Sequence, residues 1–222
     1  MPAFNEEATI ERAIERVLEA DLGVDSYELL VVENGSLDST RRVLTEREWP
    51  AEVKLIFVDR NRGKGDAIRR ALPQAAGTFS VILDADLEYD PADIAKLVQP
   101  LRDGSADAAM GTRFFHSHSA YGFWYVVGGR SVTLAANALY DAWISDILNC
   151  YKAMPTDRFR SLQLREDGFA IDAEIPARLL RDGAKIYEVP VDYMARTQSE
   201  GKKLRPRDAA KIMWTLVRCR WD

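Results

Sequence analysis

The sequence has few cysteines and lacks a long apolar run. Its two cysteines, Cys150 and Cys219, stand far apart in 222 residues and form no CxxC pair. We therefore expect reduced thiols, with neither a metal knuckle nor a disulfide framework. The longest apolar run, residues 120–127, is far shorter than the ~18 to 20 residues that cross a bilayer. The chain is not expected to span a membrane.

An excess of positive charge is also missing. The chain has 30 Lys and Arg against 35 Asp and Glu, a net charge of -5, so we expect no nucleic-acid partner. A composition of 47% hydrophobic and 29% charged residues suits one globular domain, residues 1–222. Acidic Glu6 and Glu7 stand where a signal peptide would be basic and then apolar, which favours a cytoplasmic protein.

Apolar segments of strand length alternate with amphipathic segments in the first half of the chain. Strands are expected at residues 28–32, 53–58, 79–83 and 106–111. Helices are expected from an N-cap at Asn5 to near Gly23, and at residues 39–47, 66–75 and 91–101. An aromatic-rich helical stretch at 121–147 and a last helix from about Arg207 follow. This order predicts an α/β fold, a mainly parallel sheet with helices on both faces.

The start of the sequence contains no expected strand, because Pro2 and Phe4 begin a turn-like segment directly. The first strand of a doubly wound sheet is usually central, and without it neighbouring backbone groups lose hydrogen-bond partners. We therefore expect the natural chain to start several residues upstream.

Carboxylates gather after the apolar segment 80–83, at Asp84, Asp86 and Glu88. Ligands of α/β sheets bind outside the carboxyl ends of the strands. Acids crowded at such a place repel one another unless a cation offsets them, and Mg²⁺ or Mn²⁺ suits hard oxygen ligands. The alternative is a solvated loop that caps the helix starting near Pro91. Asp90 is the better cap, which favours a metal role for Asp84 and Asp86.

Several short segments carry a family resemblance over almost the whole chain. They are PAFNE (2–6), ENGSLDST (33–40), RNRGKGD (60–66), DADLE (84–88), GTR (111–113) and YEVPVDYMAR (187–196). Together they resemble the family 2 inverting glycosyltransferases of GT-A fold, especially the branch that acts on polyprenyl (dolichol-type) phosphates. The resemblance implies a Rossmann-like sheet, with a nucleotide-sugar-binding half at 1–111 and an acceptor-side half at 112–222.

The same resemblance implies a set of site residues. Asp84, Asp86 and Glu88 would surround the metal, and Arg113 and Arg130 would face the acceptor phosphate. The implied donor-binding residues are Pro2, Phe4, Glu6, Glu33, Asn34, Lys64, Asp84, Ala85, Asp86, Arg196 and Lys203. The sequence departs from the family where Glu33-Asn34 replaces paired aspartates, where Glu88 replaces a common Gln, and where the segment 196–204 is one residue longer, which leaves Lys202 as an alternative to Lys203.

Other residues keep two readings. Gly63 and Gly65 flank Lys64 before a helix, where amides can attract a phosphate or simply form a tight loop. The basic run from Arg196 to Arg207 is either a solvated surface or a lid over the donor. His116 and His118 are assigned no role. The last helix either lies at a membrane surface or packs on the body, the reading that we favour.

The expected reaction moves a sugar from a nucleoside diphosphate to an acceptor with inversion. A polyprenyl phosphate is already anionic and needs no general base, whereas a hydroxyl acceptor needs one, with Asp146 as first choice and Glu174 as second. For Glu174 a surface role is equally expected. A catalytically inactive binding protein of the same fold is the rival from another class, and Asp84, Asp86, Arg113 and the basic run argue against it.

Overall fold

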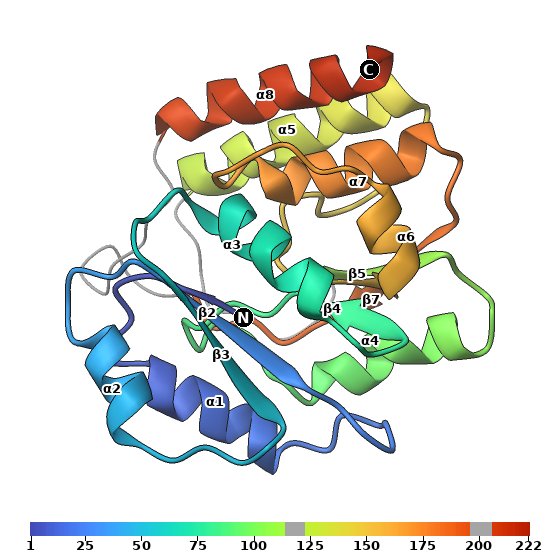
Figure 1. Cartoon of the computed structure of the whole chain (residues 1–222). Helices are drawn as coiled ribbons and strands as arrows, with labels where there is room; N and C mark the ends of the chain where they lie inside the picture. Colours follow the sequence, from blue (N-terminus) through green and yellow to red (C-terminus); the bar gives the residue numbers. More distant parts are fainter. Residues whose placement is uncertain (114–122, 196–205) are drawn as a thin grey trace.

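The structure is a computed structural model that describes residues 1–113, 123–195 and 206–222. Its amino-terminal part forms a parallel sheet in the order β1-β2-β3 (Figure 1), made of β1 (Pro2–Ala3), β2 (Leu29–Asn34) and β3 (Val53–Val58). β2 is a continuous apolar run that ends in Glu33 and Asn34, and it is buried along most of its length. A strand buried on both faces in this way is typical of parallel sheets covered by helices.

A second sheet follows in the order β4-β6-β5-β7. Its strands are β4 (Phe79–Val81), β6 (Lys152–Pro155), β5 (Ala108–Thr112) and β7 (Ile186–Pro190). β5 and β7 are parallel, whereas β6 runs antiparallel to both of its neighbours. The return strand β6 therefore brings Lys152 between the ends of β4 and β5.

Helices cover these sheets in groups (Figure 1). They are α1 (Ile10–Glu19), α2 (Thr40–Glu46), α3 (Lys64–Ala71), the 3-10 turn η1 (Leu72–Gln74), α4 (Asp93–Arg102), α5 (Phe123–Tyr140), α6 (Thr156–Ser161), α7 (Ile171–Arg181) and α8 (Pro206–Trp221). α1 and α2 lie on one side of the first sheet and α3 on the other, while α5, α7 and α8 form a separate layer. The expected α/β fold is confirmed. In the described parts of the chain, every helix is too short or too polar to cross a membrane.

The two larger clusters of buried side chains in the described residues hold the layers together. The larger one joins α1, β2, α4, α7 and the second sheet, and Ile14, Leu97 and Ile175 in it are fully buried. The smaller one fills the space between α5, α7 and α8, with Ile212 and Leu216 inside it. Each such side chain contributes roughly 1.5 to 3 kcal/mol through removal from water. α8 is thus packed on the body through one face, as expected.

Two predictions for the amino-terminal segment were wrong. Pro2 and Ala3 do form a strand, paired in parallel with Val32 and Glu33. Asn5 does not cap α1: it has a φ of 52°, and its Oδ1 accepts a hydrogen bond from Leu37 N at 2.8 Å. An Asn side chain that binds a neighbouring loop tolerates this left-handed conformation, and the helix begins one turn later.

Glycines at the start of α3 allow its backbone to touch the loop before α7. A Cβ on Gly63, which has a φ of 113°, would lie 2.4 Å from Asp167 O, and one on Gly65 would lie 2.0 Å from Glu166 O. Asp66 N donates to Asp167 O at 3.1 Å. Close backbone approach therefore explains these glycines, and one helix N-terminal amide is used by the protein itself.

We expect Gly65→Ala to lower the free energy of unfolding by about 1 to 3 kcal/mol, because its methyl group would overlap a backbone carbonyl. Gly128→Ala in α5 is the matched control, since nothing lies within 4 Å of its added Cβ. Alanine there should raise stability by roughly 0.5 to 1 kcal/mol through its helix propensity. Urea unfolding followed by circular dichroism compares them, and equal midpoints for the two variants would contradict the packing argument.

Candidate active site

Asp84 leaves the end of β4 and meets the first residue of α3. Lys64 Nζ lies 3.0 Å from Asp84 Oδ2, and the lysine side chain is only 8% exposed. Burial disfavours the Asp84 carboxylate, but Lys64 and the Cys150 thiol hold its pKa below the ordinary value. Two of the residues expected at the donor site, Lys64 and Asp84, are therefore in direct contact.

Lys64 has a second carboxylate partner that sequence reasoning missed. Its Nζ also donates to Asp172 Oδ2 at 3.1 Å, from the first turn of α7. On the far side of Asp172 lies Lys152 Nζ, 4.0 Å from Oδ1. Burial opposes the Lys64 ammonium, yet the two carboxylates outweigh it and raise the pKa of Lys64. For fully buried Lys152 burial prevails and lowers the pKa.

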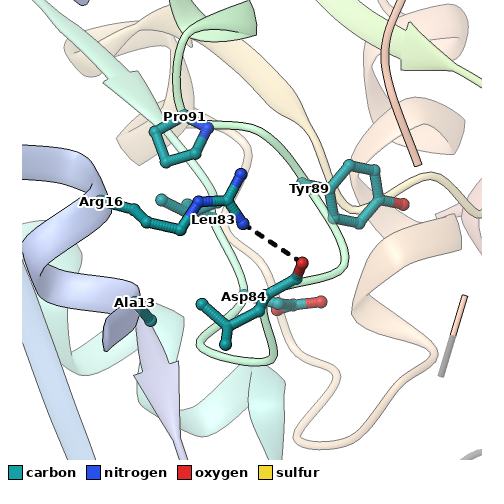
Figure 2. A pocket seen from close by; sticks show the side chains of 7 residues that line it. Ala13, Arg16, Leu83, Asp84, Tyr89 and Pro91 are labelled. Atoms are coloured by element: carbon teal, nitrogen blue, oxygen red, sulfur yellow. Dashed lines mark hydrogen bonds between the residues drawn. The ribbon is translucent and has the colours of Figure 1, made fainter. Parts of the chain in front are cut away.

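The loop after Asp84 is shaped by its own polar groups. Leu87 has a φ of 62°, and Glu88 N donates to Asp86 Oδ1 at 3.2 Å. Figure 2 shows Arg16 of α1 reaching this loop, where its guanidinium donates to Leu87 O at 3.4 Å. The hollow beside it measures about 10 Å³, room for roughly one water. Arg16 thus supports the loop from the α1 side. The hollow is too small for a nucleotide sugar.

Glu88 is held by the segment that follows β7. Tyr193 OH donates to Glu88 Oε2 at 2.5 Å, and Met194 N donates to Glu88 O at 2.9 Å. The Tyr193 ring also lies under the Arg113 guanidinium, 5.0 Å from its centroid, a cation-π distance. Tyr193 therefore links Glu88 with Arg113, a contact that has no local signal in the sequence.

The predicted metal ligands do not form a complete protein cage. Among residues 1–113, 123–195 and 206–222, no three His, Cys, Asp or Glu side chains are grouped to hold a metal. Asp84 and Asp86 nevertheless supply hard oxygen donors at one strand end. Mg²⁺ is usually held by one or two carboxylates together with substrate phosphates, so this donor set fits a cation that arrives with a diphosphate.

Arg113, at the end of β5, and Asp146, which follows α5, form a buried bidentate pair. Arg113 Nε lies 2.6 Å from Asp146 Oδ2, and Arg113 NH2 lies 2.7 Å from Oδ1. Behind them Glu188 accepts hydrogen bonds from Ser145 N and Oγ at 2.8 Å, and burial raises its pKa. The predicted residues Arg113 and Asp146 are thus together, but the carboxylate is already engaged. Arg130 lies on the exposed face of α5.

Residues expected around the nucleotide hold the loops at the ends of β1 and β2. Fully buried Glu33 accepts hydrogen bonds from Arg41 Nε and Ser36 N, both at 2.6 Å. Asn34 Nδ2 donates to Gly63 O at 2.9 Å and so ties β2 to the start of α3. Glu6 accepts from Thr9 OH at 2.9 Å. These side chains shape the loops. Pro2 and Phe4 are partly buried beside them, and buried Ala85 could reach a donor only through its backbone.

Two further groups of predicted residues have different outcomes. Glu174 is fully buried, and it accepts hydrogen bonds from Arg165 N, Glu166 N and Arg178 Nε. Its expected surface role was wrong, because its carboxylate closes the turn before α7. Arg196, Lys202, Lys203, His116 and His118 lie outside the described residues.

Comparison with solved structures identifies the fold. Glucosyl-3-phosphoglycerate synthase from Mycobacterium tuberculosis, in complex with Mn²⁺, uridine diphosphate and phosphoglyceric acid, matches with a TM-score of 0.72. The two chains are 23% identical, and the match covers 99% of this chain and 76% of the other. This likeness confirms the GT-A fold that the sequence resemblance implied.

The chain belongs to glycosyl transferase family 2, whose family model matches residues 1–156. It is 29% identical to glycosyltransferase AglJ of Haloferax volcanii, over 98% of this chain and 69% of that protein. It is 28% identical to the dolichol-phosphate mannosyltransferase of Pyrococcus furiosus, over 91% of this chain but only 57% of that protein.

We expect Asp146→Asn to lower the free energy of unfolding by about 3 kcal/mol, because the variant leaves a mostly buried guanidinium without its carboxylate. Asp157→Asn is the control, since that side chain is 95% exposed and pairs with Arg160 at the surface. Its effect should stay within about 1 kcal/mol. Guanidinium chloride unfolding measures both, and similar small losses would show that the Arg113–Asp146 pair is not a stabilising contact.

Proposed function

We propose that this glycosyltransferase passes a sugar from a nucleoside-diphosphate sugar to a polyprenyl phosphate, with inversion at the anomeric carbon. The observation that carries the proposal is the Arg113–Asp146 pair, in which both carboxylate oxygens are taken by one guanidinium. The first candidate for a general base is therefore occupied. An acceptor that is already anionic requires no base, which suits this arrangement.

The donor side of the proposal rests on Asp84 and Asp86 at the end of β4. Together with the donor's diphosphate oxygens they would hold Mg²⁺ or Mn²⁺, with Glu88 beside them. When bound, the cation stabilises the negative charge of the departing diphosphate as a Lewis acid. Pro2, Phe4, Glu6 and the loop at Glu33 and Asn34 would border the nucleotide, and Arg196 and Lys203 would close over the diphosphate.

The acceptor side rests on arginines. Arg113 and Arg130 would orient the phosphate by charge-assisted hydrogen bonds. One phosphate oxygen forms the new bond to the anomeric carbon as the bond to the diphosphate breaks on the opposite face, and no proton moves. In this division residues 1–111 bind the donor and residues 112–222 present the acceptor. The name of the Pyrococcus relative, a dolichol-phosphate mannosyltransferase, supports this acceptor class.

The alternative acceptor is a hydroxyl group on a soluble molecule or glycan. It would need Asp146 to leave Arg113, or Glu174 to leave the backbone amides that it binds inside the protein. Either change would leave a buried charge without its partner, which disfavours a hydroxyl acceptor.

We also propose that the protein lies peripherally at the cytoplasmic face of a membrane. α8 exposes Trp214 and Trp221, two turns apart on the same face, with Lys211 and Arg220 nearby. The adjoining helix α5 exposes Phe123 and Leu134. Aromatic groups with basic neighbours suit an anionic lipid surface, where a polyprenyl phosphate would reside.

Sugar transfer is tested by a screen of radiolabelled nucleoside-diphosphate sugars with Mg²⁺ or Mn²⁺. With polyprenyl phosphate present, we expect label to enter the organic phase. Label that enters only a water-soluble product made from a hydroxyl acceptor would overturn the proposed acceptor.

Asp86→Ala should reduce this transfer at least a hundredfold, on the order of the loss seen when one group that stabilises developing charge is removed. Exposed Asp21→Ala is its control and should keep the parent rate. Unchanged transfer by Asp86→Ala would defeat the metal assignment.

Membrane association is tested by sedimentation with vesicles that contain anionic phospholipid. Changing both Trp214 and Trp221 to Ser should lower the binding constant for the vesicles by roughly tenfold or more, because two aromatic anchors are lost. Leu37→Ser is the control, since Leu37 is 89% exposed but lies in the loop between β2 and α2. Equal sedimentation of the two variants would argue against α8 as the contact.

A further inference from the structure

Charged side chains of alternating sign form a buried series beside the end of β4. The order is Asp84, Lys64, Asp172, Lys152, with separations of 3.0, 3.1 and 4.0 Å between successive charged atoms. The four side chains come from the loop after β4, from α3, from α7 and from β6. Asp172 and Lys152 have no part in the reaction proposed above, so the series contains charges that still need an explanation.

Lys64 is the centre of this series, because its ammonium is shared by two carboxylates. Its side chain is 8% exposed, so water can solvate it very little. A buried cation that loses its only partner is strongly unfavourable. With Asp172 in place, Asp84 can move away and Lys64 keeps one acidic partner.

Asp172 has unused capacity to hold that cation. Among the described residues its Oδ1 is buried and has no hydrogen-bond partner, and Lys152 Nζ stands off at 4.0 Å. The carboxylate also lies in the first turn of α7, where the helix dipole favours negative charge. Asp172 can therefore hold Lys64 without help from Asp84.

We propose that Asp172 is a positioning residue that retains Lys64, so that Asp84 can exchange its ammonium partner for the divalent cation of the donor. The inference rests on the proposed metal role of Asp84. In the absence of the cation Lys64 bridges both acids. When the cation binds, Asp84 turns to it and Lys64 stays with Asp172. Without Asp172, Lys64 belongs to Asp84 alone and competes with the cation.

The test is the affinity of the protein for Mn²⁺ with and without saturating uridine diphosphate, measured from the electron paramagnetic resonance of the free ion against a blank that contains the nucleotide alone. Asp172→Asn should weaken Mn²⁺ binding by about tenfold, within the range of coupling between neighbouring charged groups. Lys64→Met should bind Mn²⁺ at least as tightly as the parent, because the competing cation is gone. In the Lys64→Met background, Asp172→Asn should change the affinity by less than about twofold.

Asp93→Asn is the matched control. Asp93 is also a buried acid in the first turn of a helix, α4, and it pairs with Lys96 at 2.6 Å. The Asp93→Asn variant should leave Mn²⁺ affinity unchanged. This result would separate the effect of Asp172→Asn on Mn²⁺ binding from the general loss of a buried ion pair. If Asp172→Asn does not fold, the Mn²⁺ affinity of Lys64→Met still tests the inference.

Three outcomes would overturn the inference. They are parent-like Mn²⁺ affinity in Asp172→Asn, an undiminished effect of Asp172→Asn in the Lys64→Met background, and weaker binding by Lys64→Met alone. In each case the parent protein still binds Mn²⁺, so the proposed metal site survives. Absence of Mn²⁺ binding by the parent protein both with and without uridine diphosphate would reject the metal assignment together with this role of Asp172.

Discussion

A lysine held between two carboxylates connects the segments on which the donor side depends. Lys64 begins α3, Asp84 lies in the loop after β4, and Asp172 lies in the first turn of α7. Buried charges are costly unless they are paired, so the three segments pack with these side chains in contact. Placement of the strand end that carries the acids is therefore coupled to the packing of a helix that is distant in sequence.

Tyr193 couples the two halves of the proposed reaction in a similar way. Its hydroxyl binds Glu88 beside the acidic loop, and its ring supports the Arg113 guanidinium. Tyr89 packs on the same ring, with centroids 5.0 Å apart. One aromatic cluster thus sets the distance between the carboxylates and the arginine. In an in-line displacement, this distance determines whether acceptor oxygen, anomeric carbon and leaving group can align.

The regular elements were predictable because their signals are local. The apolar run 53–58 forms β3 with the expected bounds, and the helix expected at 39–47 differs from α2 by one residue at each end. The amino-terminal turn was misjudged because Asn5 binds Leu37, a partner far away in sequence. Arg113 and Asp146 were each singled out from the sequence, but their mutual pairing could not be predicted from positions 33 apart.

The roles of Asp172 and Glu174 also could not be predicted from the sequence. They stand in one helical turn with similar carboxylates, yet Asp172 meets Lys64 while Glu174 closes the preceding loop. Neither role has a sequence signature, since each depends on which long-range partner the fold presents. The mixed second sheet could not be predicted either. Its antiparallel strand β6 comes from the second half of the chain, where the regular alternation of strands and helices has ended.

The contact between Gly63 and Gly65, at the start of α3, and the backbone at 166–168 restricts how members of this family can be recombined. A chimera that took its amino-terminal half from this chain and its carboxy-terminal half from a relative would bring together surfaces shaped separately. A bulkier residue at 63 or 65, or a relative's longer loop at 166–168, would push α3 away from α7 and separate Lys64 from Asp172. A crossover point should therefore be chosen so that both sides of this backbone contact come from one parent.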